Sequence, residues 1–146
     1  MQSEQKKVLF LCTGNSCRSQ MAEAWVNKLR ASEWQAFSAG IETHGMNPNV
    51  ISVMAESGVE MAGQYSKRFD ELEGQNFDLV VTVCDHAAEY CPTLPDATTV
   101  KHIPFDDPPA LAKDAKSEAE ILNSYRKVRD QIKTFIESPA LSTSSY

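Results

Sequence analysis

A short stretch near the start of the chain combines the residue types that bind and attack a tetrahedral oxyanion. An apolar, strand-like run over residues 8–11 leads into Cys12, and Arg18 follows after five intervening residues. The planar fork of an arginine can grip two oxygens of an anion, and a helix predicted to begin at this arginine adds partial positive charge. The same field favours the thiolate of Cys12, which makes it a nucleophile near neutral pH. The stretch therefore predicts a catalytic loop that attacks phosphate or an ion of the same shape.

The residues between Cys12 and Arg18 suit such a loop. Backbone amides that turn toward one centre need residues that tolerate positive φ, and the loop contains a glycine and an asparagine. The alternative is that Cys12 is a small apolar residue at a strand end, as buried cysteines commonly are. The coincidence of strand, cysteine, glycine, arginine and helix start favours the catalytic interpretation. Together with Arg18, the residues expected to bind the oxyanion are Thr13, Gly14, Asn15, Ser16 and Cys17.

Hydrophobic periodicity predicts strands and helices that alternate along the chain. Strands are predicted over 7–11, 35–39, 77–83 and 100–103, and helices over 18–30, 48–57 and 66–72. The pattern implies a single-domain, three-layer α/β/α fold with a four-stranded parallel sheet covered on both faces. Ligands of such sheets bind beyond the carboxyl ends of the strands. Because Cys12, Cys84 and Asp107 each follow a predicted strand, we expect all three at one edge of the sheet.

A last helix is predicted from the capping box that Ser117 makes with Glu120. Its apolar residues recur at helical spacing and predict the buried face of the helix. They are Ile121, Tyr125, Val128, Ile132 and Phe135.

Composition limits the class of protein. The 146 residues contain 14 Lys and Arg against 20 Asp and Glu, a net charge of -6 without a basic cluster, which argues against nucleic acid as a partner. Nothing resembles a signal peptide or a membrane span, so we expect a cytoplasmic protein that does not bind membranes. In a reducing compartment, four cysteines are catalytic, metal-binding or inert. We expect one domain over residues 1–146, ordered over about 7–137 and monomeric.

Several stretches of the sequence resemble the thioredoxin-coupled arsenate reductases, a family built on the low-molecular-weight protein tyrosine phosphatase fold. The matching stretches are CTGNSCRSQMAE at 12–23, SAGIETHG at 38–45, NP at 47–48 and FDDP at 105–108. A Cys-x5-Arg loop alone indicates only a phosphatase-like site. The additional pair Cys84 and Cys91 is what separates the reductases. The resemblance implies arsenate as substrate, since arsenate has the shape and charge of phosphate.

The resemblance also implies a relay of cysteines. Cys12 attacks arsenic, and Asp107 rather than Asp106 is the general acid, because the acid of the family directly precedes a proline. Cys84 then attacks the sulfur of Cys12 and arsenite leaves, after which Cys91 attacks Cys84 and frees Cys12. Reduced thioredoxin is the implied electron donor, and no bound cofactor is implied.

Other polar residues have weaker signals. Ser19 is placed to hold the Cys12 thiolate by a hydrogen bond, although a first-turn serine is also common in helices without any such role. We give Cys17 no place in the relay and interpret its side chain as packing. A zinc site of Cys84 and Cys91 with nearby histidines is not favoured, because the cysteine spacing is longer than the Cys-x2-4-Cys of structural zinc sites.

No metal site is predicted, but one position departs from relatives that hold potassium near the loop. Their side-chain ligands match Asn15, Glu23 and Ser38, whereas the further acidic ligand appears here as Lys67. We expect the ammonium of Lys67 to replace the potassium ion beside Glu23 and Asn15. The alternative is a solvated surface lysine.

Two other functions would use some of the same candidate site residues. A low-molecular-weight phosphatase acting on phosphotyrosine would use Cys12, Arg18 and Asp107 and leave Cys84 and Cys91 without a role. Such phosphatases usually carry aromatic residues beside the acid, whereas Pro-Pro-Ala follows at 108–110. Weak phosphatase side activity is expected even of a reductase. An arsenite-binding or redox-sensing module would need neither Arg18 nor Asp107.

Overall fold

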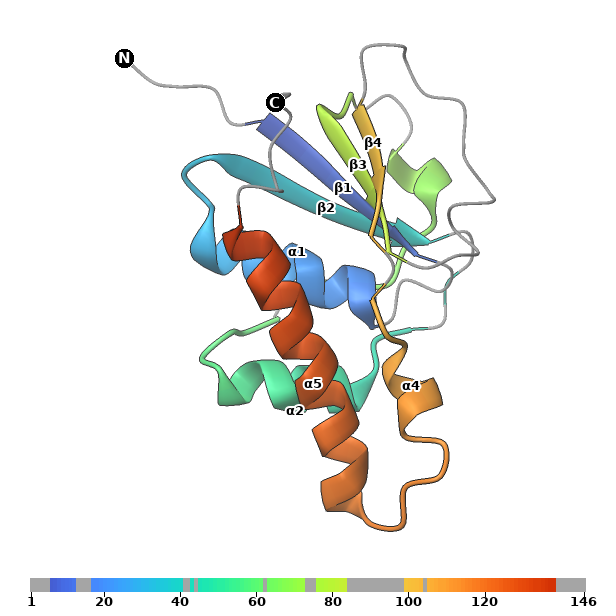
Figure 1. The fold of residues 1–146 in the computed structure, drawn as a ribbon. Coiled ribbons are helices and arrows are strands. Elements are labelled where there is room, and N and C mark those ends of the chain that lie inside the picture. The colour runs from blue at the N-terminus through green and yellow to red at the C-terminus, as the bar shows by residue number, and fades with distance from the viewer. Residues whose placement is uncertain are drawn as a thin grey trace.

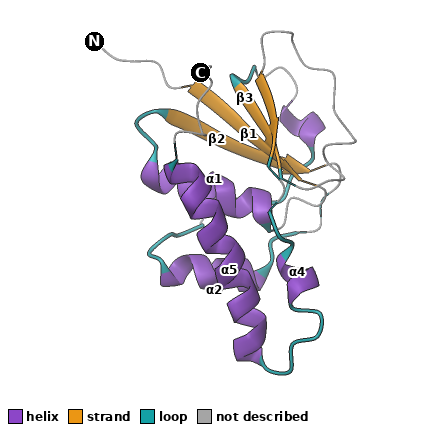
Figure 2. Cartoon of the chain, in the orientation of Figure 1, coloured by secondary structure: helices purple, strands orange, loops and turns teal. Residues whose placement is uncertain are grey.

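Four parallel strands form one sheet in the part of the chain that the computed structural model describes, which is residues 6–12, 17–40, 43, 45–61, 63–72, 76–83, 99–103 and 105–138. Their spatial order is β2-β1-β3-β4, and helices separate them along the chain (Figures 1 and 2). The strands are β1 (Lys6–Cys12), β2 (Trp34–Gly40), β3 (Leu79–Thr82) and β4 (Thr99–His102). The predicted single-domain α/β fold with a four-stranded parallel sheet is confirmed.

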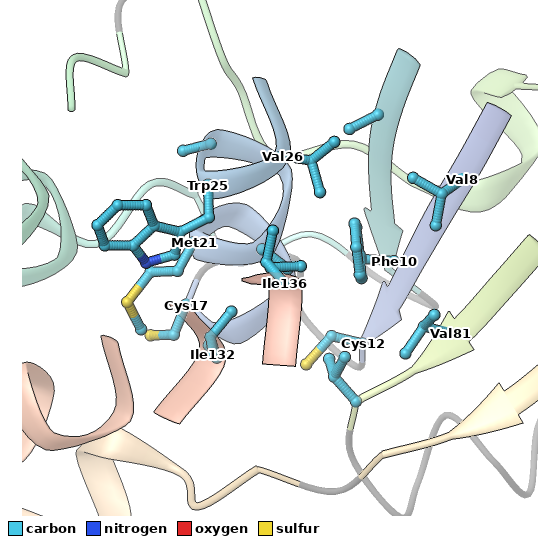
Figure 3. Packing of buried hydrophobic residues seen from close by; sticks show 14 of the residues in the cluster. Val8, Phe10, Cys12, Cys17, Met21, Trp25, Val26, Val81, Ile132 and Ile136 are labelled. Carbon is cyan, nitrogen blue, oxygen red and sulfur yellow. The ribbon is translucent and has the colours of Figure 1, made fainter. Parts of the chain in front are cut away.

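Both faces of the central strand β1 are buried. Val8 and Phe10 point toward the helices in Figure 3, and Leu9 and Leu11 therefore point to the opposite face, because side chains alternate along a strand. All four are 0% exposed. The strand β1 is thus buried on both faces, as its near-continuous apolar run predicts.

The helices α1 (Arg18–Leu29) and α5 (Glu118–Glu137) cover one face of the sheet, while α2 (Pro48–Glu56) and α4 (Pro108–Leu111) pack against α5 (Figure 1). The face that α5 turns inward carries Tyr125, Val128, Ile132 and Ile136. Ile121 and Phe135, which we also predicted for this face, are only partly buried, and Phe135 packs edge-on against Phe105, with ring centroids 5.9 Å apart. Ile136 takes its place because a spacing of four residues keeps the apolar stripe on one side of the helix.

Local signals set the ends of the helices. The Oδ1 of Asn47 caps α2 by accepting the amide of Asn49 at 2.9 Å, and the Oγ of Ser117 caps α5 by accepting the amide of Glu120 at 3.2 Å. The carboxylate of Glu120 accepts from the amide of Lys116 rather than from that of Ser117, so the capping box is shifted by one residue.

The helix predicted over 66–72 is shorter and of another type. Only η1 (Phe69–Leu72) is helical, and it is a 3-10 turn. The amide of Gly40 donates to the carbonyl of Lys67 at 2.8 Å, and Gly40 forms a parallel bridge with Arg68. Pairing with the end of β2 holds residues 67 and 68 extended and leaves only four residues to turn.

The sheet register brings the strand ends to one edge. Cys12 lies opposite Gly40 of β2, and Thr82 of β3 lies between Leu11 of β1 and His102 of β4. The residues that follow β1, β3 and β4 therefore leave the sheet at the same edge. No helix among the described residues is long and apolar enough to cross a membrane.

Candidate active site

The strand β1 delivers Cys12 to the edge where the ends of its neighbours meet. Cys12 is its last residue, is 5% exposed and carries a reduced thiol. Arg18 is the first residue of α1, so the two ends of the predicted loop stand at the carboxyl end of a strand and the amino end of a helix. The loop residues Thr13, Gly14, Asn15 and Ser16 lie outside the described residues.

The guanidinium of Arg18 is anchored on two main-chain carbonyls. Its Nη1 donates to the carbonyl of Phe105 at 3.0 Å and to that of Val83 at 3.4 Å. These carbonyls belong to the segments that follow β4 and β3. Its Nε is buried and has no hydrogen-bond partner in the structure as far as the chain is described. An unpaired buried donor is costly, so this group suits an acceptor that the described residues do not supply.

The first turn of α1 has neither a side-chain cap nor an acidic residue. Cys17 occupies the N-cap position, and its side chain makes no capping hydrogen bond. The amino end of a helix carries partial positive charge and favours anions. This helix end and the Nε of Arg18, which has no partner among the described residues, lie at neighbouring positions.

The two adjacent acidic residues after β4 point to different partners. The carboxylate of Asp107 lies 3.7 Å from Nη2 of Arg18 and is about half exposed. That of Asp106 instead accepts from Nε2 of Gln131 at 3.0 Å and lies 3.8 Å from Nζ of Lys127, both on α5. Asp107, but not Asp106, therefore has a carboxyl group beside the candidate anion site.

A second charged group consists of Glu23 on α1 and Lys67, next to Ser38 of β2. The hydroxyl of Ser38 donates to Oε1 of Glu23 at 2.5 Å, and Nζ of Lys67 lies 4.0 Å from the same oxygen. Burial raises the pKa of Glu23, while the bond from Ser38 and the charge of Lys67 act in the opposite direction. The ammonium of Lys67 also donates to the carbonyl of Tyr65 at 3.1 Å and lies 4.6 Å from the centre of its ring.

The arrangement matches that of a known family. A sequence profile of the low molecular weight phosphotyrosine protein phosphatases matches residues 7–140. The chain belongs to this family. Family membership agrees with the Cys-x5-Arg spacing and with the position of both residues between a strand and a helix.

Within the low-molecular-weight phosphatase family, the chain is similar to proteins named arsenate reductase. One from Halalkalibacterium halodurans is 47% identical over 137 residues, which cover 91% of this chain and 96% of the relative. One from Bacillus subtilis is 46% identical over 129 residues, which cover 88% of this chain and 91% of the relative. A solved structure described as an arsenate reductase in the phosphate binding state has a TM-score of 0.71 at 29% identity, covering 91% of this chain and 95% of that one.

The remaining predicted site residues of this phosphatase-family chain are described only in part. Ser19 is 0% exposed in the first turn of α1, one residue after Arg18. Cys84 and Cys91 lie outside the described residues, and their roles stay predictions. Sequence analysis missed the carbonyls of Val83 and Phe105, because every residue type carries the same main-chain acceptor.

The surroundings of Lys67 bear on the cation position expected beside Glu23. Lys67 is 7% exposed rather than solvated, and its ammonium already faces Glu23 and the carbonyl of Tyr65. A potassium ion in this position would meet like charge at short range. Asn15, the other expected neighbour, lies outside the described residues.

Proposed function

We propose that this chain is an enzyme that reduces arsenate to arsenite. The observation that carries the proposal is the buried Nε of Arg18, which has no partner among the described residues, beside a helix start without a side-chain cap and next to the strand that ends at Cys12. These donors suit a tetrahedral oxyanion. The relatives named arsenate reductase, at 47% and 46% identity, support arsenate as that anion.

In the first step, the thiolate of Cys12 attacks the arsenic atom while Arg18 and the helix start hold the oxyanion. An arsenic–sulfur bond forms, and one arsenic–oxygen bond breaks with the proton supplied to the departing oxygen by Asp107. The 3.7 Å separation between Asp107 and Arg18 supports this role, because it puts the acid beside the group that binds the anion. Ser19, buried in the same helical turn, would stabilise the thiolate.

The second step supplies two electrons. The thiolate of Cys84 attacks the sulfur of Cys12, the arsenic–sulfur bond breaks, and its electron pair stays on arsenic, which leaves as arsenite. The Cys12–Cys84 disulfide then passes to Cys84–Cys91 when Cys91 attacks Cys84. Reduced thioredoxin returns the last disulfide to two thiols. The relay needs a compartment in which thiols stay reduced, so the proposal places the chain in the cytoplasm. We also propose that the chain acts as a monomer.

The proposal is tested by following NADPH consumption with arsenate, thioredoxin and thioredoxin reductase. Wild type is expected to turn over many times, and Cys91→Ser at most once per molecule, because its Cys12–Cys84 disulfide cannot move outward. Cys17→Ser is the matched control: it should still turn over more than once per molecule, even where it binds arsenate more weakly, since Cys17 has no place in the relay. Absence of NADPH consumption together with rapid hydrolysis of an aryl phosphate would contradict the proposal and indicate a phosphatase.

A further inference from the structure

Asn47 lies where α1, α2 and α5 meet, and its side chain contacts all three. Its Nδ2 donates to Sγ of Cys17 at 3.5 Å and to the hydroxyl of Tyr125 at 3.1 Å. Its Oδ1 accepts from the amide of Asn49 at 2.9 Å and so caps α2. One amide group therefore joins the residue that precedes α1 to the middle of α5 and to the start of α2.

The residues that Asn47 joins are buried and leave little room for movement. Cys17 is 6% exposed and Tyr125 is 3% exposed. In Figure 3, Cys17 and Cys12 lie apart, so the sulfur that Asn47 holds is not directed at the nucleophile. Cys17 is also the N-cap of α1 without a capping bond. The contact with Asn47 therefore ties the side chain of the residue from which both the anion loop and the helix start extend.

We propose that Asn47 is a positioning residue of the oxyanion site, acting through the side chain of Cys17. The inference rests on the proposed function, since it requires that the site bind an oxyanion. Arg18 follows Cys17 directly, so any rotation of Cys17 also moves the backbone from which the guanidinium extends. Misplacement of binding groups by about 1 Å is enough to weaken a preorganised site strongly. Tyr125 sets the position of Asn47 from the rigid helix α5.

A purely structural role of Asn47 as the cap of α2 is the competing explanation, and the chain allows the two to be separated. Asn47→Ser keeps a side-chain oxygen that caps a helix well, but lacks the amide that reaches Cys17 and Tyr125. Tyr125→Phe removes only the hydroxyl that accepts from Asn47. Ser117→Ala is the matched control, because it removes the cap of α5 without touching a residue near Cys17.

The first measurement is the affinity of the reduced protein for inorganic phosphate by titration calorimetry. We expect Asn47→Ser to weaken phosphate binding about three- to tenfold, as loss of a buried hydrogen bond that orients the site would do. Tyr125→Phe should weaken it less, and Ser117→Ala should bind as wild type does even where its melting temperature falls. The decisive readout is a double-mutant cycle, in which Asn47→Ser has little further effect once Cys17→Ala has removed the sulfur.

A second readout is the pH profile of Cys12 alkylation by iodoacetamide, followed by mass spectrometry of the Cys12 peptide. Asn47→Ser should shift the midpoint of this profile upward, because a displaced helix start and arginine stabilise the thiolate less. Wild-type phosphate affinity in Asn47→Ser, or an equal loss with and without Cys17, would overturn the inference while the proposed function stands. Failure of wild type to bind either phosphate or arsenate would overturn both.

Discussion

Two arginine–carboxylate groups of the molecule differ in how completely they are satisfied. Between α2 and α5, Glu56 receives two hydrogen bonds from Arg126, at 2.9 and 2.7 Å, and one from Arg129 at 3.1 Å. At the edge of the sheet, Arg18 and Asp107 are 3.7 Å apart and the Nε of Arg18 has no partner among the described residues. The first group joins two helices and is complete. The second leaves a buried donor of Arg18 without an acceptor among the described residues.

The difference lies in what holds each arginine. Arg129 places Nη1 on the carbonyl of Val53 at 2.9 Å as well as on Glu56, so it has both a main-chain and a carboxylate acceptor. In the part of the chain that the structure describes, Arg18 hydrogen-bonds to main-chain carbonyls, and the carboxylate of Asp107 is 3.7 Å away. Neutral anchors leave more of the charge of Arg18 available to an incoming anion. We therefore expect large effects on kcat/KM when Arg18 or Asp107 is changed, and small effects on stability when Glu56 or its arginines are changed.

The largest effect is expected at Arg18. Arg18→Lys keeps the charge but loses the planar fork, so we expect kcat/KM with arsenate to fall about 10³-fold, by analogy with the loss of transition-state donors. The coupled NADPH assay measures this. Arg126→Lys is the matched control in the complete group, and it should leave kcat/KM within about twofold of wild type. Similar kinetic losses in both variants would contradict the comparison.

The next largest effect is expected at Asp107. Asp107→Asn removes the proposed proton donor, and we expect kcat/KM to fall about 10²- to 10³-fold, as for other general acids. Phosphate affinity should not fall, because the substitution removes a negative charge beside the anion.

Asp106→Asn supplies the control for Asp107, since Asp106 faces Lys127 and Gln131 on α5. Its kcat/KM is expected to stay within about twofold of wild type. If Asp106→Asn were the more damaging of the two, the assignment of the acid would be wrong.

A third charged group is formed by Lys67 and Glu23. We expect changes in it to affect the stability of the fold, more than changes at Glu56 do. Lys67→Gln leaves a buried carboxylate without its cation, which should lower the free energy of unfolding by about 2–3 kcal/mol at neutral pH. Burial raises the folded-state pKa of Glu23 above its usual value. A raised carboxyl pKa means that stability is lost as pH rises through it. The deficit of Lys67→Gln should therefore shrink below that pKa, which urea unfolding at several pH values can measure.

Potassium provides an independent check on Lys67. Because its ammonium lies beside Glu23, exchange of sodium for potassium at constant ionic strength should leave wild-type turnover unchanged. A clear rise in wild-type activity with potassium would contradict the interpretation of Lys67 as a built-in cation.

The smallest effect is expected at Glu56. Its two arginines lower its pKa to about 2 from an ordinary 4.5, so its contribution is present above about pH 4.5 and is lost as pH falls toward 2. Glu56→Gln should lower the melting temperature slightly at neutral pH, less at high salt and not at all near pH 2. Thermal unfolding of Glu56→Gln and wild type between neutral pH and pH 2 measures this difference. The turnover of Glu56→Gln should equal that of wild type.

Much of the fold and part of the site could be predicted from the sequence because the signals are local. The apolar run before Cys12 and the helical pattern after Arg18 set a strand and a helix whose observed bounds agree with the prediction. The helix expected over 66–72 failed because pairing of Arg68 with Gly40 is a long-range contact that no local pattern contains. Likewise, the periodicity of α5 did not separate Phe135 from Ile136, since both lie near the edge of the apolar stripe.

The contacts that orient the site were not predictable in the same way. Asn47 carries a recognisable cap signal for α2, but its bonds to Cys17 and Tyr125 depend on how three helices meet. The chemistry of the site is thus visible in residue types, whereas its alignment depends on tertiary contacts.

The anchoring of Arg18 on main-chain carbonyls has an evolutionary consequence. A carbonyl is present whatever side chain the residue carries, so positions 83 and 105 can exchange one apolar residue for another without releasing the guanidinium. Selection can then alter what surrounds the anion, including the acid and any neighbouring thiols, while the arginine keeps its direction. Substitutions around Arg18 can therefore accumulate one at a time while its guanidinium stays anchored.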